Sequence, residues 1–226
     1  MLKKSLIIFS IVTAFAKLSS AATITDNFKL QVGDLLFQDL NCGQFCDNVD
    51  SVTYGYNNSY VSHVALVVNA SESNPQVIEA ISQGVSITPL EKFLERSLDE
   101  KHQPRVMVGR LKPIYQKLIP TAIQIAELQV GKPYNESFVA ANGQAFYCSE
   151  LIDYSFQESN HSYTLFHRLP MNFTNGKSNK ILPLWQNYYQ NLQIHVPQGQ
   201  LGTNPGAMSR ESSIQIIHLY GQLREH

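Results

Sequence analysis

The chain has 226 residues, a formal net charge of −1 and 15% charged residues. This nearly balanced charge, with no basic stripe along the sequence, argues against a nucleic-acid-binding protein. The length is sufficient for one domain with a full hydrophobic core.

The first 22 residues have the order of features that is typical of a secretory signal peptide. Lys3 and Lys4 precede an apolar run over 5–16, and a stretch of small residues follows over 19–22. We expect cleavage after residue 22, a single domain over 23–226, and export to the periplasm or the medium. The apolar run is too short to span a bilayer and Lys17 interrupts it, so we expect no transmembrane anchor.

The remaining elements are predicted from hydrophobic periodicity and turn residues. In chain order they are a turn and strand over 30–37, a loop or short helix over 41–60, a strand over 62–68, a loop over 69–75, strands over 76–81 and 84–88, a helix over 90–98, a strand over 105–111, helices over 119–130 and from 148 on, an ambiguous segment over 181–191, and a last strand over 214–220. Strands that cluster before the helices, with one closing strand, predict an α+β fold.

Export makes the three cysteines informative. Cys42 and Cys46 lie in one polar loop, and an oxidising compartment permits a disulfide between them. Two reduced thiols and half of a zinc site are the alternatives, although no second pair with zinc-ligand spacing follows. We therefore expect no metal and no cofactor. A Cys42–Cys46 pair would leave Cys148 as the odd thiol.

Cys148 is the candidate nucleophile. A break at 143–144 precedes it, and Leu151, Ile152 and Phe156 follow it with helical spacing, so the thiol is expected in the first turn of a helix. There the unpaired N–H groups and the helix dipole favour a thiolate, which a cysteine hydrolase requires. The alternative is an inert cysteine that fills the core as a small apolar side chain.

His63 and Glu79 are the candidate base and orienting group. If the 69–75 loop joins an antiparallel pair with Val68 opposite Gln76, then Ala65 lies opposite Glu79 and His63 points to the same face. A carboxylate there can hold the imidazole in one tautomer and stabilise the imidazolium. The alternatives are a structural histidine and an exposed strand carboxylate.

Several short motifs, in this order, resemble one family. They lie at 32–37 (VGDLLF), 62–68 (SHVALVV), 77–80 (VIEA), 131–134 (GKPY), 147–151 (YCSEL) and 204–209 (NPGAMS). Together they resemble the permuted branch of the NlpC-type papain-like cysteine hydrolases, the YiiX/YebB-like group, over 30–220.

The resemblance implies a circularly permuted papain-like fold, in which a small, barrel-like antiparallel sheet packs on helices and the histidine precedes the cysteine. It implies that Cys148 is the nucleophile, His63 the base and Glu79 the third polar residue. An oxyanion hole would use the backbone N–H of Cys148. The second donor stays open among three alternatives: Tyr134, Tyr147 and loop residues near Asp39.

These features predict an exported cysteine hydrolase that cleaves an amide bond through a Cys148 thioester. Its substrate is expected in the cell envelope, first among the peptides of peptidoglycan. A lipid amide or ester hydrolase, or an acyltransferase of the same fold, is the alternative. A second alternative is an inactive envelope binding module, because a fold can keep its cleft without its chemistry.

Overall fold

The computed structural model describes residues 28–161, 164–174 and 179–226. The expected signal peptide lies outside these residues. In chain order the elements are β1 (Leu35–Gln38), α1 (Gln44–Val52), the 3-10 helix η1 (Tyr56–Asn58), β2 (His63–Asn69), β3 (Gln76–Ile81), β4 (Gly84–Pro89), α2 (Leu90–Leu94), β5 (Val106–Leu111), the 3-10 helix η2 (Pro113–Leu118), α3 (Ile119–Glu127), α4 (Cys148–Ser159), β6 (Leu169–Pro170), α5 (Pro183–Asn191), β7 (Leu201–Gly202), α6 (Pro205–Ser209) and β8 (Ile214–Leu219). Within the described ranges, every helix is too short or too polar to cross a membrane.

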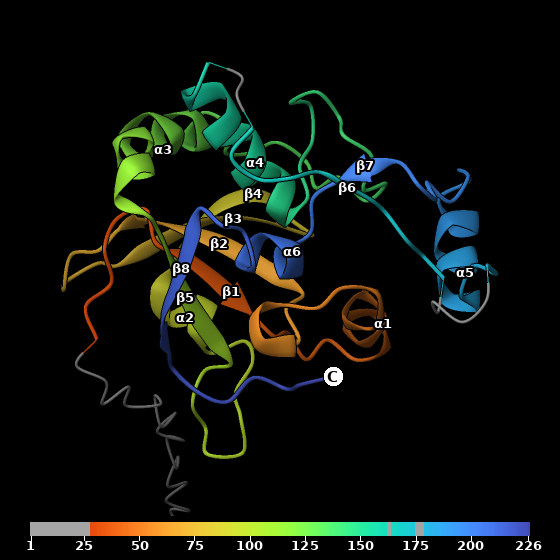
Figure 1. Cartoon of the computed structure of the whole chain (residues 1–226), viewed down its shortest axis with the longest axis horizontal. Coiled ribbons are helices and arrows are strands. Elements are labelled where there is room, and N and C mark those ends of the chain that lie inside the picture. Colours follow the sequence, from red (N-terminus) through yellow and green to blue (C-terminus); the bar gives the residue numbers. More distant parts are fainter. Residues whose placement is uncertain (1–27, 162–163, 175–178) are drawn as a thin grey trace, which may run out of the picture.

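An antiparallel sheet forms the centre of the molecule (Figure 1). In the described part of the chain it has six strands in the order β4-β3-β2-β1-β5-β8, and β6 pairs with β7 in a separate two-stranded ribbon. Each strand of the large sheet overlaps a segment predicted as a strand, to within one residue at its end. The last described strand, β8, pairs with β5, so the first and the last described strands lie in the same sheet.

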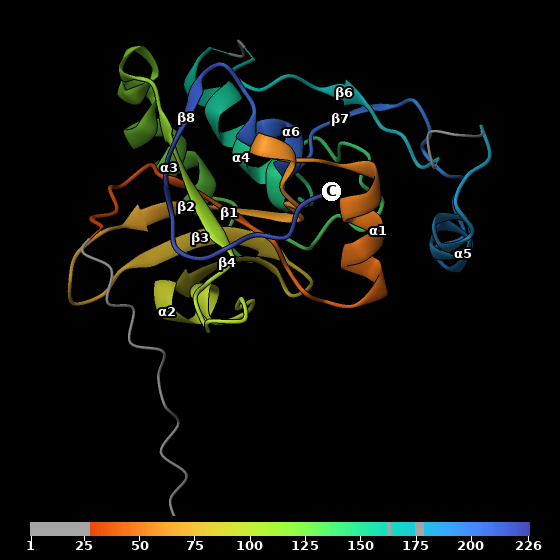
Figure 2. The ribbon, with the colours of Figure 1, turned by 60° about the horizontal axis from the view of Figure 1, so that its bottom comes forward.

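Helices cover both faces of this sheet, with α3 and α4 on one side and α2 on the other (Figure 2). Because side chains alternate along a strand, Leu35 and Phe37 of β1 enter the core with α3 and α4, whereas Leu36 enters the core with α2. Two buried layers therefore fix β1 and β2 from both sides. The site described below lies where the start of β2 meets the start of α4.

Two helices are shorter than predicted. The helix expected over 90–98 ends at Leu94, because the chain turns after Glu95 and Leu98 forms an isolated bridge with Pro104. The helix expected over 119–130 ends at Glu127, before a turn that places Gly131 at a φ of +86°. The 41–60 loop contains α1, and the ambiguous segment over 181–191 contains α5.

The β2–β3 hairpin differs from prediction at one end only. The expected pairing of Val68 with Gln76 is wrong, because a β-bulge places Asn69 opposite Gln76. Further from the loop, Leu66 pairs with Ile78, as the expected register requires. The part of the hairpin that carries the candidate site therefore has the predicted register.

Candidate active site

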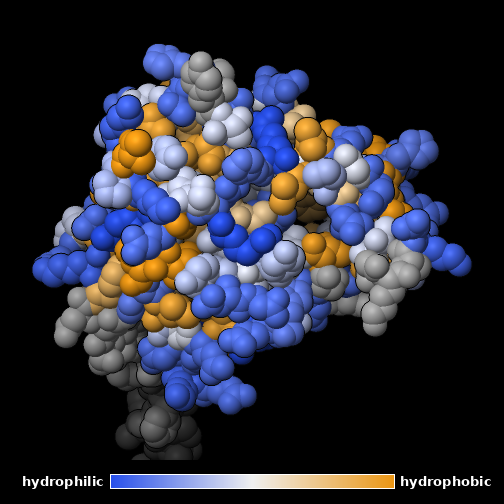
Figure 3. Space-filling model, viewed as in Figure 1, coloured by the Kyte–Doolittle hydropathy of each residue, from blue (hydrophilic) through white to orange (hydrophobic). Residues whose placement is uncertain are grey.

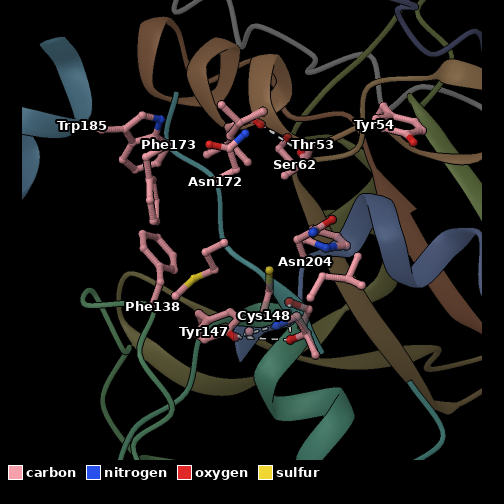
Figure 4. A pocket seen from close by; sticks show the side chains of 18 of the residues that line it. Thr53, Tyr54, Ser62, Phe138, Tyr147, Cys148, Asn172, Phe173, Trp185 and Asn204 are labelled. Carbon is pink, nitrogen blue, oxygen red and sulfur yellow. Dashed lines mark hydrogen bonds between the residues drawn. The ribbon is translucent and has the colours of Figure 1, made fainter. Parts of the chain in front are cut away.

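Cys148 is the first residue of α4, as its sequence context predicted. Its thiol forms no disulfide, and the residue is only 6% exposed. Figure 4 shows the sulfur pointing from the start of the helix into a pocket, with Phe138 and Tyr147 to one side and Asn204 to the other. The first N–H groups of a helix have no partner inside the helix, so this sulfur lies beside unpaired donors.

The start of α4 is held by its own third residue, Glu150. This carboxylate accepts hydrogen bonds from the backbone N–H of Tyr147 at 3.3 Å and of Ala141 at 3.0 Å, and from the side chain of Asn135 at 2.9 Å. The bonds tie the helix terminus to the preceding loop. Sequence reasoning missed this role of Glu150, although a Glu at the third helical position is a known capping signal.

His63 is the first residue of β2 and is buried. Its Nε2 lies 2.7 Å from Oε2 of Glu79, so Nδ1 is the ring nitrogen that this carboxylate does not occupy. Burial disfavours the imidazolium, but hydrogen bonds with Cys148 and Glu79 and the charges of both groups outweigh it and raise the pKa of His63 to about 9. A His63 with this pKa is cationic at neutral pH.

Glu79, on β3, is fully buried and has a partner for each of its oxygens. Besides His63, it accepts a hydrogen bond from Thr88 Oγ1 at 2.6 Å and two from the Arg96 guanidinium, each at 2.6 Å. Burial alone would raise the pKa of Glu79, but the bonds from His63, Arg96 and Thr88 lower it to about 2. Glu79 is therefore a buried group that is ionised at neutral pH. Sequence reasoning identified Glu79 but missed Arg96 and Thr88.

The three alternatives for a second oxyanion donor have different surroundings. In the loop near Asp39, the Asp39 carboxylate itself is buried and forms an ion pair with Arg224. The Tyr147 hydroxyl accepts a hydrogen bond from the Thr203 N–H at 3.1 Å. Tyr134 lines the pocket with Cys148, and an isolated bridge to Phe146 holds it beside the start of α4. Burial and the nearby Cys148 raise the pKa of Tyr134 well above that of a free phenol, so its hydroxyl keeps its proton.

The pocket above Cys148 is mainly apolar. It has a volume of about 300 Å³ and takes its walls from α1, the β6–β7 ribbon, α5 and the loop before α4. Its apolar and aromatic lining residues include Val49, Phe138, Met171, Phe173 and Trp185. In Figure 3 a hollow bordered by hydrophobic side chains opens between the main body and the part that carries α5.

A disulfide joins Cys42 to Cys46 at the start of α1, which decides among the alternatives left by the sequence. Arg224 fixes the same helix from the C-terminal end of the chain, with ion pairs to Asp39 at 2.6 Å and to Asp50 of α1 at 3.2 Å. Because α1 forms one wall of the pocket, these links hold that wall against the sheet. Phe45, which lies between the two cysteines, lines the pocket, so the disulfide loop lies beside it.

Among the residues that the structure describes, no group of three or more His, Cys, Asp or Glu side chains is arranged to hold a metal ion. The imidazole of His63 instead contacts the carboxylate of Glu79, the Arg96 guanidinium lies behind that carboxylate, and Cys148 is close enough to act on the pKa of His63. Such an arrangement can supply a nucleophile and move a proton.

Comparison with known proteins identifies the fold and the family. The chain resembles the crystal structure of the metalloprotein yiiX from Escherichia coli O157:H7, with a TM-score of 0.68 and 21% sequence identity over 85% of this chain and 98% of that one. No curated protein matches the chain. A model of the permuted papain-like amidases, YaeF/YiiX, matches residues 29–218. The α+β, permuted papain-like fold predicted from the sequence is thereby confirmed, and the chain belongs to the C92 family of permuted papain-like amidases.

Proposed function

We propose that this amidase acts through Cys148 as nucleophile, His63 as general acid and base, and Glu79 as the group that orients His63. The observations that support the proposal most are the buried 2.7 Å contact between His63 Nε2 and Glu79 and the interaction of His63 with Cys148, which helps to raise the pKa of the imidazole. This is the nucleophile–base–orienter arrangement of covalent acyl transfer.

The reaction has two steps. The Cys148 thiolate attacks the amide carbonyl carbon, a thioester forms, and the C–N bond breaks as the His63 imidazolium gives its proton to the leaving amine. Neutral His63 then takes a proton from water, the hydroxide attacks the thioester, and the acid leaves as the thiolate and imidazolium are restored. The oxyanion of each tetrahedral intermediate would accept hydrogen bonds from the Cys148 N–H and the Tyr134 hydroxyl.

The pocket supports an apolar acyl group as the part of the substrate on the carbonyl side. Most of its walls are aromatic and aliphatic, neutral polar side chains such as Ser62 and Asn204 make up the rest, and Arg210 is the charged side chain among its described lining residues. Peptidoglycan peptides, our first expectation from the sequence, carry several charged groups that such walls cannot pair. Burying an unpaired charge is costly, so the pocket favours the lipid amide or ester alternative.

Two substrate series test the proposal. One contains N-acyl anilides with increasing acyl length, and the other contains purified muropeptides. We expect turnover of medium and long acyl amides by the wild type and none by Cys148→Ala. Turnover of muropeptides alone would show that the substrate is a peptide of peptidoglycan and not an acyl amide. Retained turnover in Cys148→Ala would refute the mechanism, and binding without turnover by the wild type would support a binding module.

Export is part of the proposal as well, on the basis of the charge, apolar and small-residue pattern of the first 22 residues. N-terminal sequencing of the protein recovered from the periplasm or medium should begin at residue 23. Recovery of the whole chain with its original N-terminus from the cytoplasm would contradict it.

A further inference from the structure

Arg96 lies in the turn directly after α2, and its side chain is about one-quarter exposed at 27%. Its two terminal nitrogens donate to the two oxygens of Glu79, each at 2.6 Å. Such bidentate pairs fix the plane and the direction of a carboxylate, which a single lysine nitrogen cannot do.

The surroundings of Arg96 also link it to the histidine. Its guanidinium carbon lies 5.6 Å from the centre of the Phe93 ring, and that ring lies 5.9 Å from the imidazole of His63. The Phe93 carbonyl accepts a hydrogen bond at 2.9 Å from Gln38, the β1 residue paired with His63. The helix end that carries Arg96 is therefore built onto the strands that carry the candidate site.

We propose that Arg96 is a positioning residue, which holds the buried Glu79 carboxylate ionised and directs its Oε2 toward His63. The inference rests on the proposed roles of Cys148, His63 and Glu79. Without the guanidinium, burial would favour a protonated Glu79, and a neutral carboxyl stabilises the imidazolium much less.

The groups that face Glu79 are few. His63 approaches from β2 and Arg96 from the turn after α2, whereas β4 contributes the neutral Thr88. Cys148 of α4 acts on this carboxylate through His63. A change in the acid titration of the site on loss of Arg96 can therefore be assigned to Glu79 and its partner histidine.

The test is the rate of Cys148 alkylation by iodoacetamide as a function of pH, which needs no substrate. In Arg96→Gln we expect the acid midpoint of this profile to rise by about one pH unit or more, since an opposite charge shifts a neighbouring carboxyl by about 1–3 units. Arg96→Lys, which keeps the charge but loses the second hydrogen bond to Glu79, should give a midpoint between those of the wild type and Arg96→Gln.

Lys92→Gln is the matched control, because Lys92 lies on α2 with a 66% exposed side chain that pairs with Glu95 instead. Its profile should equal that of the wild type. A purely structural role for Arg96 predicts a lower melting temperature with an unchanged midpoint, and that result would overturn the proposal. If Arg96→Gln fails to fold, an Arg96→Lys profile identical to the wild type overturns it equally. If Cys148 of the wild type reacts as an ordinary thiol, that result would instead contradict the proposed function itself.

Discussion

The Nε2 atom of His63 lies 2.7 Å from Oε2 of Glu79, although the two residues come from different strands and both are buried. Charged groups out of water are stable only when they are paired, and here the imidazole, the guanidinium of Arg96 and the carboxylate satisfy one another. Since Nε2 is occupied by Glu79, Nδ1 is the ring nitrogen that remains for the thiol of Cys148 in the proposed mechanism. This bond therefore decides which ring nitrogen can exchange a proton with the candidate nucleophile.

Loss of the base His63 should lower activity more than loss of the orienting charge of Glu79. We expect His63→Ala to lower kcat/KM by about 10²–10⁴-fold, the usual contribution of a general acid–base group. Glu79→Gln keeps the shape of the side chain and should cost less, because the imidazole remains beside the thiol. Steady-state kinetics on the best acyl amide would measure both. A larger loss in Glu79→Gln, with unchanged melting temperature, would contradict these roles.

The pKa of His63, about 9, predicts the alkaline limit of activity. The imidazolium supplies the proton for the leaving amine, so kcat/KM should fall as the pH rises through about 9. The same shift affects stability. Because the pKa is raised above its ordinary value of 6.5, the favourable interactions of the imidazolium are complete below pH 6.5 and are lost as the pH rises through about 9. A pH–rate profile with an alkaline midpoint near 6.5 would show that His63 is not held by Cys148 and Glu79.

The sequence predicted the elements that carry periodic patterns, and it missed contacts that depend on how these elements pack. The strand over 76–81 and its Glu79 follow from alternation and from a charge among apolar neighbours. The sequence predicts Arg96 inside a helix over 90–98. In the structure that helix ends at Leu94, and the turn that follows brings Arg96 to Glu79. No local pattern in the sequence records such an encounter between a turn and a strand.

The pocket likewise depends on packing that no periodic pattern in the sequence predicts. The chain has 11 Tyr and 11 Phe residues, but which of them converge on one pocket depends on non-local structure. The β6–β7 ribbon pairs Leu169 with Gly202 across a long separation, and two-residue strands carry too little periodicity to be predicted. Trp185 of α5 reaches the pocket lining only through this arrangement.

Filling the pocket should shorten the acyl chain that it accepts. Val49 on α1 lines the pocket, and Val49→Phe adds an aromatic ring to its lining. We expect the longest acyl amides to lose kcat/KM while the shortest keep it, which a series of N-acyl anilides would measure. The same substitution at Val130, which is 47% exposed and outside the pocket, is the control. An equal loss at every chain length would mean that the acyl group does not lie there.

The Cys42–Cys46 disulfide should stabilise the fold modestly. It joins residues only four positions apart, and closing so short a loop is worth about 2 kcal/mol of unfolding free energy in the chain-entropy account. We expect Cys42→Ser/Cys46→Ser to lose about this amount in urea denaturation. Since α1 forms a pocket wall, the variant should also raise KM for long acyl amides more than it lowers kcat. An unchanged KM would show that the disulfide does not influence substrate binding in the pocket.

The reactivity of the Cys148 thiol tests the central claim most directly. Iodoacetamide labelling, mapped by peptide mass, should be measured at pH 6, where an ordinary thiol with a pKa of about 8.5 is almost entirely protonated. We predict rapid labelling of Cys148 in the wild type and slow labelling in His63→Ala, because the imidazolium stabilises the thiolate. Slow labelling of the wild type at pH 6, or equal labelling of both proteins, would contradict a Cys148–His63 ion pair.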